Sequence, residues 1–74
     1  MDLLQLQYFR TIAQYENLTK AAQALFVSQP NVSPSLSRLE DDLGVKLFER
    51  RRGKIALTRN GKLFLTYVER VLDG

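Results

Sequence analysis

Residues 18–50 of this chain read LTKAAQALFVSQPNVSPSLSRLEDDLGVKLFER. The small residues near the start predict a short helix over about residues 20–25, with Thr19 as its N-cap. Apolar residues at steps of four, three and four predict a second helix over about residues 29–43 with a single apolar stripe. That stripe consists of Val32, Leu36, Leu39 and Leu43. Two helices joined by a tight turn are typical of a helix-turn-helix that reads DNA.

The face of the second helix opposite its stripe is polar in the N-terminal half. A recognition helix enters the major groove with that end, and phosphates would repel Asp41 and Asp42 near the other end. Polar side chains in this half can bond to base edges or phosphates, while the free N–H groups at both helix starts are natural phosphate sites. Ser28 has a second open role as a helix cap, and the two roles are compatible. The residues expected at DNA on these grounds are Thr19, Lys20, Ser28, Gln29, Asn31, Ser33, Ser35, Ser37 and Arg38.

A basic run follows at residues 49–54, ERRRGK, which holds four of the 11 cations in the chain. With Gly53 as a turn residue, the run and the apolar segment after it predict a β-hairpin, or wing, over about residues 50–56. Arg51, Arg52 and Lys54 have no obvious internal partner, so we expect them at the minor groove, whose negative potential attracts arginine. Arg50 has two open roles, an ion pair with Glu40 and a DNA contact.

Two further helices are predicted on either side of these elements. One covers residues 3–15, and its apolar face consists of Leu3, Leu6, Phe9, Ile12 and Ala13. The other begins at Arg59, is capped by Thr58, and carries two adjacent apolar rows. At about 1.5 Å per residue it is roughly 22 Å long, more than a small core needs, so the surplus face should meet a second subunit. The expected dimerisation residues are Phe64, Tyr67, Val68, Val71 and Leu72.

These elements together predict a mainly α fold, a winged helix-turn-helix with a three-helix core and a two-stranded wing. We place this DNA-binding domain at residues 1–58 and a long C-terminal linker helix at residues 59–74. A chain of 74 residues has room for one such domain. A symmetric homodimer would present two recognition helices to successive major-groove faces of a nearly palindromic site.

The composition argues against other classes of function. The chain has no Cys and no His, which removes thiolate ligands and the commonest general base, so we expect neither a metal site nor an enzyme. It shows no signal peptide and no stretch of roughly 20 apolar residues, so we expect a cytoplasmic protein with no membrane contact. The alternative is a small helical protein–protein interaction module. Such a module would not need the cations of the wing, and only DNA binding should weaken steeply with added salt.

Short sequence motifs along the chain also match one known family. They are Leu6 with Phe9, LTKAA at residues 18–22 with Leu25, VSQP at residues 27–30 with Ser33, Leu39-Glu40, Leu43-Gly44, LFER at residues 47–50, and Leu57-Thr58 with Gly61. Over essentially the whole chain this pattern resembles the LysR-type bacterial transcriptional regulators. The resemblance implies sequence-specific DNA binding by a homodimer, joined through the linker helix, on an interrupted inverted repeat. It also implies a C-terminal domain, similar to periplasmic binding proteins, that binds a small-molecule effector. We therefore expect this chain to be an isolated DNA-binding fragment with no cofactor of its own.

The family also suggests roles for individual positions. Its members use the equivalents of Ser28, Gln29, Pro30, Ser33 and the residue at 34 around the major groove, and basic wing residues, here within residues 50–54, at the minor groove. This sequence departs from the family at Pro34, where relatives often have Arg, Lys or Gln. Proline inside a helix loses a hydrogen bond and can kink the axis. We therefore predict a distorted or re-started helix near Pro34, with specificity moved to Asn31, Ser35 and Arg38.

Overall fold

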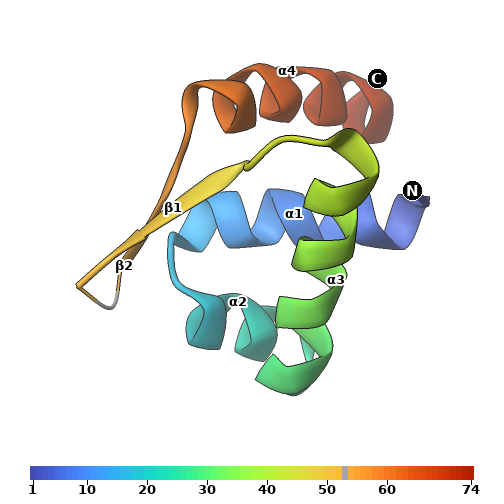
Figure 1. The fold of residues 1–74 in the computed structure, drawn as a ribbon. Helices are drawn as coiled ribbons and strands as arrows, with labels where there is room; N and C mark the ends of the chain where they lie inside the picture. The colour runs from blue at the N-terminus through green and yellow to red at the C-terminus, as the bar shows by residue number, and fades with distance from the viewer. Residues whose placement is uncertain (53) are drawn as a thin grey trace.

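The computed structural model describes residues 1–52 and 54–74 and contains four helices and a β-hairpin among them (Figure 1). Their order is α1 (Leu3–Tyr15), α2 (Leu18–Leu25), α3 (Gln29–Leu43), β1 (Phe48–Arg51), β2 (Lys54–Leu57) and α4 (Arg59–Asp73). The strands are antiparallel, with Phe48 opposite Leu57 and Arg51 opposite Lys54. This arrangement confirms the predicted winged helix-turn-helix fold with a long C-terminal helix. The turn assigned to Gly53 lies outside the described residues.

Local caps determine where the helices begin. Asp2 accepts the N–H of Gln5 while the Gln5 side chain accepts the N–H of Asp2, forming a capping box at α1. Thr58 caps α4 as predicted, since its hydroxyl oxygen accepts the N–H of Gly61 at 3.0 Å. The predicted cap of α2 is wrong. Asn17 accepts the N–H of Lys20 at 2.9 Å, and α2 therefore begins at Leu18, two residues before the predicted start.

Helix α3 is a single α-helix that runs through Pro34. The predicted re-start near Ser33 is wrong. Proline removes only one intrahelical bond, the one that the carbonyl of Pro30 would have accepted, and the other bonds of the helix are enough to carry it through this point. At the start of α3, Ser28 occupies the N-cap position, but its side chain makes no capping hydrogen bond. Its predicted capping role is therefore limited to the backbone.

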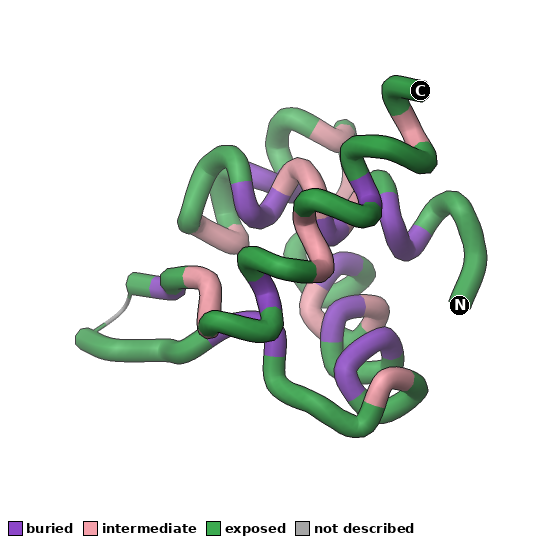
Figure 2. The backbone as a smooth tube through the Cα atoms, turned by 90° about the horizontal axis from the view of Figure 1, so that it is seen from above, coloured by how far each residue is buried: buried purple, intermediate pink, exposed green. Residues whose placement is uncertain are grey.

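The core lies where α1 meets the other elements. In Figure 1, α1 crosses the middle of the molecule, with α4 on one side and α2 on the other, and α3 runs across it from the level of α2 toward α4. Buried positions line the inward faces of the helices in Figure 2. The largest fully buried side chains are Phe9, Ile12, Leu39, Leu47, Val32 and Val68. Leu3, the first residue of the predicted apolar face of α1, is 60% exposed, because the apolar row runs past the end of the core there.

The outer face of α4 differs from the predicted dimerisation set. Val68 is fully buried in the domain's own core, so its assignment to the dimer contact is corrected. Phe64 and Leu72 are half-buried against that core, and their part in a dimer contact stays a prediction. The exposed apolar residues of α4 are Leu63 (65%), Tyr67 (51%) and Val71 (43%). Each is four residues from the next, so they form one stripe along the helix.

Gly61 lets α4 approach the segment that leads into β1. A Cβ at this position would overlap the carbonyl oxygen of Leu47 and lie 2.9 Å from Cδ2 of Leu57. The bond from Thr58 N–H to the Leu47 carbonyl, 3.0 Å long, fixes the same approach. Because β2 leads directly into α4, this contact also sets the direction in which the wing leaves the core. Within the described part of the chain, no helix is both long and apolar enough to cross a membrane.

Candidate nucleic-acid interface

The N-terminal half of α3 presents an exposed polar face. Asn31, Ser37 and Arg38 are all exposed, on the side of the helix away from the buried row of Val32, Leu36 and Leu39. Arg38 takes part in none of the ion pairs formed among residues 1–52 and 54–74. These side chains are therefore available to a ligand, and the rest of the protein does not use them.

A first groove joins the starts of α2 and α3 to the wing. Its lining residues are Asn17, Leu18, Thr19, Gln29, Arg50, Lys54 and Ile55. The hydroxyl of Thr19 lies 3.1 Å from Oε1 of Gln29 and donates to it, which ties the two helix ends together. Two cations thus lie beside two helix N-termini, where free N–H groups and the helix dipole favour an anion. This arrangement suits a phosphate.

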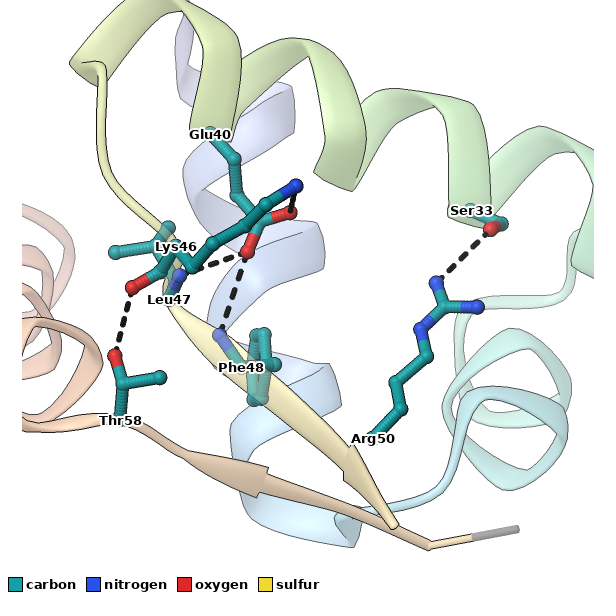
Figure 3. A network of polar contacts seen from close by, with 7 residues as sticks. All are labelled: Ser33, Glu40, Lys46, Leu47, Phe48, Arg50 and Thr58. Atoms are coloured by element: carbon teal, nitrogen blue, oxygen red, sulfur yellow. Dashed lines mark hydrogen bonds and ion pairs between the residues drawn. The ribbon is translucent and has the colours of Figure 1, made fainter.

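A second groove separates α3 from the wing. It is lined by Ser33, Ser37, Glu40, Lys46, Phe48 and Arg50. Arg50 lies on the same face of β1 as Phe48, because side chains two apart in a strand share a face, and its Nη2 is 3.5 Å from Oγ of Ser33 (Figure 3). The alternative role of Arg50, an ion pair with Glu40, is absent from the ion pairs of the described residues.

Glu40 instead anchors the wing to the recognition helix. Its Oε2 accepts the backbone N–H of Leu47 at 2.7 Å and that of Phe48 at 3.3 Å (Figure 3). The residue is 8% exposed, and Nζ of Lys46 is 3.9 Å from its other oxygen. A buried carboxylate thus holds the first residues of the wing at a fixed place beside α3. Sequence reasoning missed this role, since Glu40 is one of three consecutive acids and the local sequence does not reveal which of them will accept backbone amides.

The wing carries the cations predicted for it, with one correction. Arg51 was expected to have no internal partner, but its Nη2 is 3.4 Å from Oε2 of Glu49, two residues away on the same face of β1. Both side chains are exposed, and exposed pairs of this kind contribute about 0–1 kcal/mol, so Arg51 is only weakly held. Arg52 and Lys54 are exposed and belong to none of the ion pairs of the described residues.

The remaining predicted residues surround α3. Pro30, Asn31, Pro34, Ser35 and Arg38 line a third groove, between α3 and the first half of α1. Lys20 and Ser28 are exposed beside the first groove. The structure therefore groups the predicted site residues around the N-terminal half of α3, with the wing on one side and α1 on the other.

Comparison with known proteins identifies the family. Residues 3–62 match the family of bacterial regulatory helix-turn-helix proteins of the LysR type. The HTH-type transcriptional regulator CitR of Bacillus subtilis is 45% identical over 73 residues, which are 99% of this chain and 25% of CitR. The chain thus spans about a quarter of the length of this curated relative.

Solved structures show the same fold together with DNA. The crystal structure of a CbnR_DBD–DNA complex matches with a TM-score of 0.95 at 42% identity, covering 99% of this chain and 84% of that one. The complex of BenM_DBD with benA site 1 DNA matches with a TM-score of 0.94 at 34% identity, covering 99% of this chain and 82% of that one. These matches favour DNA binding over the protein–protein interaction module. The chain belongs to the LysR family of bacterial transcriptional regulators and is a DNA-binding domain of that family.

Proposed function

We propose that the chain binds double-stranded DNA with the N-terminal half of α3 in the major groove and with the wing at the minor groove. The observation that carries this proposal is the grouping of exposed polar and cationic side chains around α3. Arg50 and Lys54 line one groove with Gln29, and Arg38 lines another with Asn31. Both grooves open beside the same end of the helix.

The side chains divide into two kinds of contact. Thr19, Lys20 and Ser28 lie near helix N-termini and suit phosphates, which position the domain without reading sequence. Base edges are left to the polar side chains of α3, where each good bidentate contact discriminates by about 1–3 kcal/mol. Those residues are Gln29, Asn31, Ser33, Ser35, Ser37 and Arg38. Arg50, Arg51, Arg52 and Lys54 extend the contact to the minor groove.

The exposed stripe of α4 suits a second copy of the chain. Leu63, Tyr67 and Val71 form an apolar row that faces outward, and a symmetric pairing would bury the same row from both subunits. Such a homodimer presents two recognition helices, which fits an interrupted inverted repeat with half-sites about one helical turn, or a multiple of it, apart.

The full-length regulator has further functions that we also propose. Since the chain covers about a quarter of the length of its curated relative, we place binding of a small-molecule effector outside residues 1–74. We assign no catalytic activity and no cofactor to these residues. Because the proposed ligand is chromosomal DNA, we expect the protein to act in the cytoplasm.

Selection from a random DNA pool, followed by salt titration, tests the proposal. The enriched site should bind the wild-type chain with an affinity that falls steeply with salt. Arg52→Ala with Lys54→Ala should weaken binding to specific and random DNA alike and reduce the salt slope by about 1.8 per domain, or about 0.9 per lost phosphate contact. The control is Lys62→Ala with Arg70→Ala, which removes two exposed cations of α4 and should leave the slope unchanged. An unchanged slope in the wing variant would contradict the wing assignment, and an unenriched pool would contradict DNA recognition altogether.

A further inference from the structure

Pro34 lies at the outermost line of the recognition helix. It is exposed and lies inside the continuous helix α3. Val32 and Leu36, two residues before and after it, are both buried. At 3.6 residues per turn each is roughly 160° around the helix from Pro34. Pro34 therefore points away from the core, toward whatever α3 meets.

The position is apolar, while its neighbours on the same face are polar. Proline has no backbone N–H and three side-chain methylene groups, so position 34 offers no donor and an entirely hydrocarbon surface. Asn31 is one turn before it, Arg38 is one turn after it, and all three line the same groove. Because the helix is unbroken, Pro34 keeps its place between these two polar residues and is not displaced from the face they share.

The chemistry of the major groove leaves one suitable partner for this surface. Base edges there present hydrogen-bond donors, acceptors and, at thymine alone among the four bases, a C5 methyl group. A polar edge placed against Pro34 would lose water without gaining a partner, which is unfavourable. A methyl group placed there loses nothing and buries apolar surface.

We propose that Pro34 is a specificity-determining residue that selects a thymine through its C5 methyl group. This inference rests on the DNA binding proposed above and adds the chemistry of one base in the site. Pro34 thus does more than remove a donor: it replaces a hydrogen-bonded reading of that base pair with an apolar one. The first half of α1 also lines this groove, with Leu4 exposed, so a protein partner is the competing occupant. The polar flanks at Asn31 and Arg38 favour DNA.

Single-atom changes in the DNA test the proposal. With the site selected by the wild-type chain, each thymine of one half-site is replaced in turn by deoxyuridine, which lacks only the methyl group. Binding of the wild type and of Pro34→Ser is then measured for every duplex. In the wild type one replacement should weaken binding about fourfold, the factor expected for one methyl-sized group buried from water. In Pro34→Ser the same replacement should have no effect.

A second substitution at that thymine separates the methyl group from the rest of the base. Replacing the thymine–adenine pair by 5-methylcytosine–guanine should be tolerated better by the wild type than replacing it by cytosine–guanine. Pro34→Ser should not distinguish the two. Asn31→Ala is the matched control, because it alters a neighbour in the same groove but should keep the methyl dependence of the wild type. Circular dichroism melts of the variants establish that they are folded.

Two results of these binding measurements would overturn the inference. If deoxyuridine weakens the wild type and Pro34→Ser equally at every thymine, Pro34 does not read a methyl group. If no deoxyuridine replacement weakens binding of the wild type, no thymine methyl group is read and the inference fails in the same way. These outcomes presuppose an enriched site, so they differ from failure of the proposed function, in which no site is enriched.

Discussion

Replacing Glu40 by alanine should separate the wing from the recognition helix and destabilise the domain. Both amides that the carboxylate accepts, those of Leu47 and Phe48, are buried contacts. Leaving a buried donor unsatisfied costs about 1–3 kcal/mol. The Leu47 bond is short at 2.7 Å, and the Phe48 bond is longer at 3.3 Å. At about 1–3 kcal/mol for each unsatisfied donor, we give the short bond most of the cost and the long bond the least. The free energy of unfolding should therefore fall by about 3 kcal/mol.

This loss is large for a domain of this size. At roughly 0.05–0.15 kcal/mol per residue, 74 residues have a free energy of unfolding of about 4–11 kcal/mol. The variant should therefore still fold at low temperature, with a melting temperature lowered by about 12–24 °C, at about 4–8 °C for each kcal/mol. Glu40→Gln keeps one acceptor oxygen and loses the charge. Since charge-assisted bonds are about twice as strong as neutral ones, it should cost only about 1 kcal/mol.

Urea unfolding followed by circular dichroism gives these free energies. Asp41→Ala is the matched control, because Asp41 is the next acid on α3 but is exposed, and its free energy of unfolding should stay within about 0.5 kcal/mol of wild type. Lys46→Ala should be equally mild, since its ammonium group is exposed and 3.9 Å from the carboxylate. If Glu40→Ala unfolds at the same urea concentration as Asp41→Ala, the carboxylate does not hold the two amides and our account of the anchor is wrong.

Four other substitutions test three separate parts of the structure. Gly61→Ala should lower the free energy of unfolding by about 1–3 kcal/mol, because the added methyl group overlaps the Leu47 carbonyl; a wild-type melting temperature would show that α4 can move away. Asn17→Ala should cost about 1 kcal/mol in urea unfolding through loss of the α2 cap, and no change would contradict the assigned cap. Val71→Asp should give monomers in sedimentation without loss of the fold, whereas Val68→Asp, in the core, should unfold the domain. A dimer that survives Val71→Asp would rule out this stripe as the interface.

Much of the fold could be predicted from the sequence, because helix positions depend on residues only a few places apart. The steps between Val32, Leu36 and Leu39 require one buried stripe wherever α3 packs, and the bounds of α3 were predicted correctly. The cap at Thr58 is equally local, as it joins residues three apart. The same locality explains the error at α2: Asn17 and Thr19 are both good caps, and the choice depends on how α1 ends. The predicted re-start near Pro34 was wrong because the loss of one hydrogen bond does not end a helix whose other hydrogen bonds are formed.

The sequence predicted which residues belong to the candidate site but not how they are arranged. The exposed polar residues of α3 follow from the position of its apolar stripe, since what is opposite a buried face is exposed. The partner of Arg50 cannot be predicted in this way, because Ser33 and Glu40 are both within the reach of its long side chain. Only the twist and register of the wing place Arg50 beside Ser33.

The sequence by itself determined the helices, the basic wing and the outward face of α3, since each depends on the character of neighbouring residues and on helical or strand periodicity. Tertiary structure alone decided which apolar row of α4 is core. Both rows are apolar, and only packing into the core buries Val68 and leaves Tyr67 exposed. It also decided that Glu40 accepts amides seven and eight residues away and that Gly61 adjoins Leu47. Such contacts depend on how the chain returns to itself, which local patterns do not specify.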